Sequence, residues 1–161
     1  GLLDLVIRYR YSINRYTQAS TKANYSKILN IKGLPMTTTV ANILLAHGSR
    51  DPQWQTPFIE MANSIKAQGH HSHANILIEL AYMELCEPSL EQVCEKFANQ
   101  GIDLINVYPV FFAAGRHLRI DVPKQLANIE QGLNIKTKLH PPVGQEQKVQ
   151  DAITQVILNR L

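Results

Sequence analysis

Two histidines and a glutamate stand out because each follows a short apolar run. His47 and Glu84 come directly after such runs, and His117 closes a longer segment that follows a third. Imidazoles and carboxylates are intermediate-to-hard ligands that suit Fe, Co, Ni or Zn ions, and three of them leave coordination positions open for exchange. Imidazoles also carry protons near neutral pH. Taken singly, each residue is more typical of an ordinary polar loop, so the elements that position them decide the interpretation.

Four short β-rich runs alternate with longer helical segments, which is typical of βαβ units and a parallel sheet. The predicted strands are residues 42–46, 75–80, 103–108 and 135–139. The first three are apolar enough to be buried on both faces, and the last alternates apolar and polar residues like an edge strand. The predicted fold class is α/β: a four-stranded parallel sheet flanked by helices.

Amphipathic helices are predicted between the strands and after the last. The first has Asp51 as its N-cap and Pro52 as its first residue, and Gly69 is expected to end it. The others are expected from about residue 88 to 101, from 121 to 130 with Gly132 beyond, and from 145 to 161. Helical spacing places two sets of apolar residues on one face each. These are Leu90, Val93, Cys94 and Phe97 in the second helix, and Val149, Ile153, Val156 and Ile157 in the last.

The predicted topology gathers His47, Glu84 and His117 at one rim. All three lie in strand-to-helix loops, and ligands of such sheets bind outside the carboxyl ends of the strands, where the connections diverge. Together they predict a site that holds a divalent metal ion or moves protons.

The composition limits the class of protein. The chain has 161 residues, 45% of them hydrophobic, which indicates one compact domain. No apolar run approaches the roughly 20 residues of a membrane-spanning helix, so we expect no membrane partner. Cys86 and Cys94 form neither a zinc-ribbon spacing nor a disulfide framework, which favours a reducing compartment, the cytoplasm.

The formal charge of +3 is unevenly distributed. Residues 1–35 hold six Lys or Arg and one Asp, a balance of +5, whereas residues 36–161 hold ten against twelve, a balance of −2. Residues 1–35 are interpreted as a disordered basic leader or tail: a transit peptide, upstream coding sequence or a leader added in cloning. Met36 is the expected start of the folded domain. Nucleic-acid binding by the tail would be salt-sensitive and lost with residues 1–35; we expect no nucleic-acid partner.

Two further motifs carry less weight. The histidines at positions 70, 71 and 73 could bind Ni, Co or Zn ions, but they precede the second strand and so lie at the opposite end of the sheet. They are interpreted as an exposed turn, with metal storage as the alternative. Ser49 neighbours His47, but no Gly-x-Ser-x-Gly elbow surrounds it, which argues against hydrolase chemistry.

Three sequence pieces occur in order, each after a predicted strand. They are Leu44-Leu-Ala-His47-Gly-Ser-Arg50-Asp, Ala81-Tyr-Met-Glu84-Leu-Cys-Glu-Pro-Ser89, and Val107-Tyr-Pro-Val-Phe-Phe-Ala-Ala-Gly-Arg-His117 running into Asp121-Val-Pro123. Together they resemble the short-form sirohydrochlorin chelatases of the class II chelatase group, which insert a divalent metal into a modified tetrapyrrole. His-Gly-Ser alone is a weak motif. The set of three, with its spacing over about residues 40–160, is specific.

The resemblance implies a role for each site residue. His47 and His117 would be the metal-binding histidines, with one or both accepting pyrrole protons, and Glu84 their acidic partner. Ser49, Arg50 and Arg116 would contact the carboxylates of the tetrapyrrole. For Arg119 and Lys124, substrate contact and plain surface charge have equal weight. Three aromatic residues could pack against the face of the tetrapyrrole ring, although residues beside a buried strand more commonly belong to the core. They are Tyr82, Phe111 and Phe112.

The resemblance also implies the reaction and the assembly. Co²⁺ or Fe²⁺, with Ni²⁺ as a further candidate, would be the metal substrate in cobalamin or siroheme biosynthesis, with no tightly bound cofactor. Because residues 36–161 supply only one flavodoxin-like chelatase half-domain, a homodimer is expected. The alternative is a non-catalytic carrier of metal or tetrapyrrole with the same fold.

Overall fold

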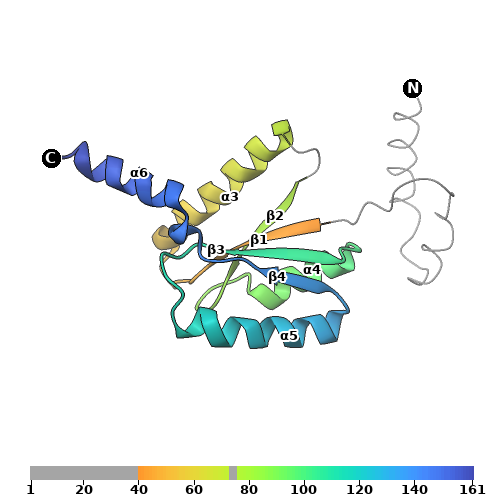
Figure 1. Ribbon diagram of the computed structural model, residues 1–161. Helices are drawn as coiled ribbons and strands as arrows, with labels where there is room; N and C mark the ends of the chain where they lie inside the picture. The colour runs from red at the N-terminus through yellow and green to blue at the C-terminus, as the bar shows by residue number, and fades with distance from the viewer. Residues whose placement is uncertain (1–39, 73–75) are drawn as a thin grey trace, which may run out of the picture. The chain divides into compact units, whose positions relative to one another are not determined.

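A four-stranded parallel sheet, in the order β2-β1-β3-β4, forms the centre of the described part of the chain. The structure is a computed structural model that describes residues 40–72 and 76–161 (Figure 1). The strands are β1 (Val40–Ala46), β2 (Leu77–Tyr82), β3 (Leu104–Pro109) and β4 (Lys136–Leu139). The predicted α/β class is confirmed. The predicted leader, residues 1–35, and the expected domain start at Met36 lie outside the described residues.

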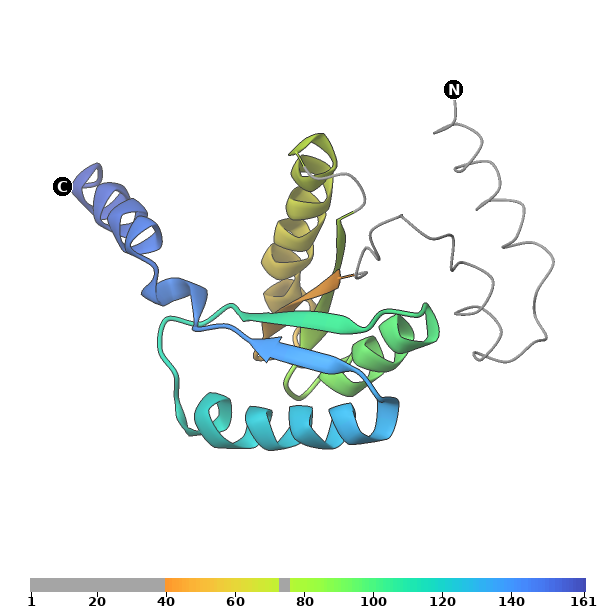
Figure 2. The same cartoon turned by 45° about the vertical axis from the view of Figure 1, so that its right-hand side comes forward.

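Helices cover both faces of the sheet. The α4 (Leu90–Asn99) and α5 (Val122–Leu133) helices lie on one face and α3 (Pro52–Ser72) on the other, as Figure 2 shows. A π-helical turn, η1 (His117–Asp121), leads into α5, and a 3-10 turn, η2 (Val143–Gln145), leads into α6 (Gln147–Leu158). None of the described helices combines the length and the apolar character needed to cross a membrane.

The core lies between the sheet and the α4–α5 layer. The four residues predicted to face inward from the second helix are all buried: Leu90, Val93, Cys94 and Phe97. A capping box of Ser89 and Gln92 begins this helix. Burying one such large apolar side chain contributes about 1.5–3 kcal/mol. Burial also raises the pKa of the Cys94 thiol to about 12, with a smaller contribution from the charge of Glu91.

The prediction that three strands are buried on both faces is wrong for β3 and for β2, an edge strand in which Leu77, Glu79 and Leu80 are half-buried. Burial alternates along β3, where Leu104, Asn106 and Tyr108 are only half-buried. The reason is the uneven cover of the sheet. The α3 helix packs against β2, and α6 buries none of its residues. The alternation predicted for the edge strand β4 is present.

Two glycines do not end the helices they were expected to end. Gly69 lies inside α3, which continues to Ser72, and a Cβ on Gly69 would come within 2.5 Å of the Ile76 side chain. This glycine therefore serves close packing. The main chain of His70 and His71 consequently belongs to the last turn of α3 and not to a turn outside a helix, and residue 73 lies outside the described part.

The α5 helix also continues past its predicted end. Gly132 lies within α5, and Asn134, with φ of 52°, is the left-handed residue that ends the helix. A single glycine in a helix costs only about 1 kcal/mol relative to alanine, so it does not oblige the helix to stop. The predicted end near Glu130 is therefore three residues short.

The last helix carries its predicted apolar stripe on an uncovered face. Ile153, Val156 and Ile157 are between 38% and 54% exposed, and no residue of α6 is buried. Both views show α6 extending away from the sheet (Figures 1 and 2). The described part of this chain thus leaves an amphipathic helix without a packing partner.

Candidate active site

The connections diverge between β1 and β3. The chain leaves β1 for α3 on one face, whereas it leaves β3 for α5 on the other, and this divergence opens a crevice at the carboxyl ends of the strands. A cavity of about 230 Å³ lies there. Its lining comes from the loops after β1, β2 and β3, namely His47, Met83, Phe111, Ala113, Gly115, Arg116, His117 and Leu118.

His47 and Glu84 are brought together by main-chain pairing that continues past the ends of β1 and β2. The Met83 N–H donates to the Ala46 carbonyl at 2.9 Å, and the Glu84 N–H donates to the His47 carbonyl at 3.1 Å. The side chains follow, with His47 Nε2 at 3.5 Å from Glu84 Oε1. Both side chains are about half exposed, at 46% and 48%, so substrate can reach them.

Gly48 makes this approach possible. Its φ of 104° lies in the left-handed region, which residues with a side chain rarely adopt. A Cβ at this position would also overlap the carbonyl oxygen of Glu84. The glycine after His47 is therefore needed for the close passage of the two loops.

The spacing of the His47–Glu84 pair suits a shared metal ion. Zn–N and Zn–O bonds of about 2.1 Å would place one ion between donors 3.5 Å apart at an angle of about 113°, near the tetrahedral value. The same gap is longer than the 2.7–2.9 Å of a strong charge-assisted hydrogen bond. The two side chains can therefore act as two ligands of one ion.

His117 lies on the other wall of the cavity, in the turn η1. Its Nδ1 is 2.7 Å from Asp121 Oδ2, and the two side chains are 65% and 53% exposed. Within residues 40–72 and 76–161, no three His, Cys, Asp or Glu side chains gather closely enough to hold one metal ion. The structure thus pairs two of the three predicted ligands, and the third, His117, lines the same cavity as His47.

The predicted substrate contacts are distributed around this crevice. The Ser49 hydroxyl accepts the Asp51 N–H at 3.1 Å, which gives it a role in the turn that starts α3. Asp51 caps α3 as predicted, through the Gln53 N–H at 2.9 Å. Arg50 and Arg116 are exposed, and neither has an ion pair among the described residues.

The remaining candidate contacts of the tetrapyrrole, three aromatic and two basic residues, differ in how exposed they are. Tyr82 is 2% exposed and belongs to the core, whereas Phe112 is 69% exposed beside the cavity. Phe111 lies between these extremes and meets the His47 ring edge-on at 6.3 Å. Arg119 and Lys124 are exposed on η1 and α5.

Sequence reasoning gave no role to Asp121 or His140. Asp121 follows His117 by four residues, and in a helical turn this spacing brings two side chains together, so the contact could have been predicted from it. His140 directly follows β4 at the same rim, stacks on Tyr108 at 4.2 Å, and approaches Asn106 Oδ1 with its Nε2 at 3.0 Å. Desolvation, together with the nearby charge of Lys138, lowers the pKa of His140.

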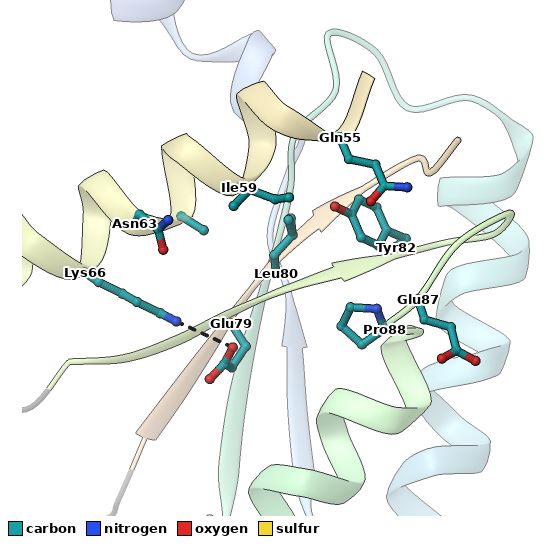
Figure 3. Close-up of a pocket in the computed structure, with 10 residues that line it drawn as sticks. Gln55, Ile59, Asn63, Lys66, Glu79, Leu80, Tyr82, Glu87 and Pro88 are labelled. Atoms are coloured by element: carbon teal, nitrogen blue, oxygen red, sulfur yellow. Dashed lines mark ion pairs between the residues drawn. The ribbon is translucent and has the colours of Figure 1, made fainter. Parts of the chain in front are cut away.

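A second cavity, of about 260 Å³, lies between α3 and the edge strand β2 (Figure 3). Lys66 pairs there with Glu79 at 3.6 Å, and Lys96 reaches the same carboxylate at 2.8 Å. Burial acts to raise the pKa of Glu79, but the two lysines outweigh it and the pKa is lowered. The lining includes Tyr82, one of the candidate aromatic contacts of the ring, but none of the predicted metal ligands or carboxylate contacts, and it shares no residue with the lining of the crevice.

Fold and site together define a parallel α/β half-domain that presents two histidines and a glutamate at its topological switch point. The CbiX family model matches residues 41–159, and the chain belongs to this family. The resemblance inferred from the three sequence pieces is thereby confirmed.

Relatives and solved structures agree with this assignment. The sirohydrochlorin cobaltochelatase of Sulfurisphaera tokodaii is 31% identical over 113 residues, which cover 70% of this chain and 87% of the relative. The cobalamin (vitamin B12) biosynthesis CbiX protein of Marinobacter aquaeolei VT8 has a solved structure that matches with 34% identity and a TM-score of 0.65, over 76% of this chain and 94% of that one.

A longer protein shares the fold. The sirohydrochlorin chelatase SirB of Bacillus subtilis subspecies spizizenii, solved in complex with cobalt, matches with a TM-score of 0.65 at 24% identity. The match covers 75% of this chain but 50% of SirB. The domain described here therefore corresponds to half of the SirB chain.

Proposed function

We propose that this chain inserts a divalent metal ion, Co²⁺ or Fe²⁺, into sirohydrochlorin, as a metal-chelating lyase of cobalamin or siroheme biosynthesis. The observation that carries the proposal is the His47–Glu84 pair, 3.5 Å apart at the switch point of a CbiX-family fold. The name of the Sulfurisphaera tokodaii relative supports the same reaction. The metal is a substrate here, and Ni²⁺ is a third candidate.

Metal insertion requires the ion to lose bound water and the macrocycle to lose two N–H protons. His47 Nε2 and Glu84 Oε1 would hold the ion from one side and leave its remaining positions for water and then for the ring nitrogens. His117, on the opposite wall, would complete the metal set or accept a pyrrole proton through Nε2. Its 65% exposure would let it pass that proton to solvent and accept the second.

Sirohydrochlorin carries many carboxylates, so cationic groups near the crevice would orient it. Arg116 lines the cavity and Arg50 lies in the loop after β1. Because both guanidinium groups have no ion pair in the described part of the chain, they are available for charge-assisted hydrogen bonds with substrate carboxylates. Ser49 would contribute a weaker contact, since its oxygen already accepts a main-chain N–H.

The active assembly would be a homodimer. A cavity of about 230 Å³ is smaller than the roughly 300–1,000 Å³ of sites that enclose drug-sized ligands, and a tetrapyrrole is larger still. A second half-domain would supply the missing walls, as the doubled length of SirB suggests. The exposed stripe of α6 offers the apolar surface that such an interface needs. Free thiols at Cys86 and Cys94 support a reducing compartment, the cytoplasm.

The test is anaerobic insertion of Co²⁺ and Fe²⁺ into sirohydrochlorin, followed by absorbance with the uncatalysed rate subtracted. Multiple turnovers per chain would support the chelatase and rank the metals. A spectral change that stops at one equivalent would instead identify a carrier of metal or tetrapyrrole. No change with folded protein would contradict sirohydrochlorin as the substrate.

A further inference from the structure

Asp121 is the only residue whose side chain forms a hydrogen bond or ion pair with His117 within the described part of the chain. His117 and Asp121 begin and end the five-residue turn η1, and Nδ1 of the histidine lies 2.7 Å from Oδ2 of the aspartate. This distance is within the 2.7–2.9 Å typical of a charge-assisted hydrogen bond between nitrogen and carboxylate oxygen. The neutral imidazole can make this bond only as donor, with the proton on Nδ1.

The carboxylate of Asp121 has no competing structural task. Asp121 stands at the N-cap position of α5, where aspartate commonly accepts main-chain N–H groups, but its side chain makes no capping bond. The cap is unnecessary because η1 continues directly into α5, and the Val122 N–H already donates to the His117 carbonyl. Irregular π-helical turns of this kind occur frequently at functional sites.

We propose that Asp121 is the positioning residue of His117. By accepting the Nδ1 proton, its carboxylate fixes the ring orientation and the tautomer in which the Nε2 lone pair is free. A free imidazole favours the opposite tautomer, with the proton on Nε2, which could neither ligate a metal ion nor accept a pyrrole proton through that atom. That Nε2 ligates a metal ion or accepts a pyrrole proton rests on the proposed function. That the proton sits on Nδ1 rests on the Asp121 contact alone.

His47 is held in a different way. Its Nε2 faces Glu84 across 3.5 Å, and its Nδ1 lies 3.4 Å from the Gly48 carbonyl, so neither nitrogen has a short bond. Only one of the two histidines is therefore locked by a carboxylate before substrate arrives. The inference concerns His117 alone.

The test determines the tautomer directly in the metal-free chain of 161 residues. Side-chain ¹⁵N NMR at about pH 8, above the ordinary histidine pKa of about 6.5, distinguishes a protonated Nδ1 from a protonated Nε2. Asp121→Ala removes the acceptor, and Asp121→Asn keeps an amide oxygen that can still accept. Asp103→Asn is the matched control, because it removes the same charge from an exposed site before β3.

The wild type and Asp103→Asn should show His117 protonated at Nδ1. Asp121→Ala should move the proton to Nε2 and lower Co²⁺ affinity or insertion about 10–100-fold, with Asp121→Asn in between. A wild-type His117 protonated at Nε2, or an unchanged tautomer in Asp121→Ala, would overturn the proposal. If the tautomer responds as expected while wild-type protein inserts no metal, the positioning role stands and the proposed function fails.

Discussion

The Glu84 N–H donates to the carbonyl of His47 at 3.1 Å, so main-chain pairing, and not attraction between side chains, sets these two residues side by side. The side chains themselves stop at 3.5 Å. Because the pairing extends the β1–β2 ladder, the sheet holds the main chains of the two residues at a fixed spacing. A site built on such a support needs little rearrangement to receive an ion.

Glu84→Gln should weaken Co²⁺ binding about tenfold or more, because the amide cannot supply a charged oxygen opposite His47 Nε2. Titration calorimetry on folded protein would measure this. Glu87→Gln is the control, since Glu87 lies in the same loop and, among the residues that the structure describes, its side chain bonds to Gln92 alone. Equal affinity in Glu84→Gln and wild type would remove Glu84 from the ligand set and leave it an orienting role at most.

Gly48→Ala should lower the free energy of unfolding by about 2 kcal/mol or more, since the new Cβ meets both a left-handed φ and the Glu84 carbonyl. Metal binding should fall with it. Gly132→Ala, in α5 with open space around its position, should instead stabilise by about 0.5–1 kcal/mol. Urea unfolding of both variants tests the pair, and equal effects would contradict the role given to Gly48.

Charges placed on the apolar stripe of α6 should dissociate the proposed dimer. The double variant Ile153→Asp with Ile157→Asp should sediment as a monomer at concentrations where wild type sediments as a dimer. Ile59→Asp, which charges an equally exposed isoleucine of α3, is the control. A monomeric wild type would overturn the homodimer, and an unaffected dimer would place its interface elsewhere.

A thiol reagent should modify one cysteine per folded chain at pH 8. Cys86 is partly exposed, whereas Cys94 is fully buried and its pKa is raised to about 12. The thiolate is the reactive form, so Cys94 should react only after unfolding. Intact-mass analysis before and after urea gives the count. Two rapid modifications in the native state would show that α4 opens readily.

Glu130 should make the fold sensitive to acid. The main-chain N–H of Thr137, followed by its hydroxyl, donates to this carboxylate and lowers its pKa below the ordinary 4.5. The unfolded state then binds its proton first, so the stabilisation is present above pH 4.5 and is lost as the pH falls through the lower, folded-state pKa. Glu130→Gln should therefore cost less than about 1 kcal/mol at pH 7 and almost nothing near pH 3.

Urea unfolding of wild type and Glu130→Gln at both pH values would check this dependence. Glu95→Gln, at an exposed position on α4, is the control. A loss that is the same at pH 7 and pH 3 would mean that packing, and not the charge of Glu130, holds α5 to β4.

The positions of the candidate site residues at one rim of the sheet could be predicted from the sequence because the signals are local. A histidine or glutamate directly after a buried run must lie at the carboxyl rim, and His47 and Glu84 do. Helix ends were harder, since Gly69 and Gly132 are stop signals only when no packing or longer pattern overrides them. The Asp121 contact and the exposed face of α6 depend on three-dimensional placement, which periodicity does not report.

The two walls of the crevice leave the sheet in opposite directions, one through α3 and one through η1 and α5. Changes of length or sequence between Val110 and His117 can therefore alter the width of the opening without disturbing the ladder that carries His47 and Glu84. The size of the accepted ring would then vary over evolution while the His47–Glu84 pair stays the same. For protein engineering, the loop after β3 is accordingly the place to alter ring selectivity while the donor pair is kept intact.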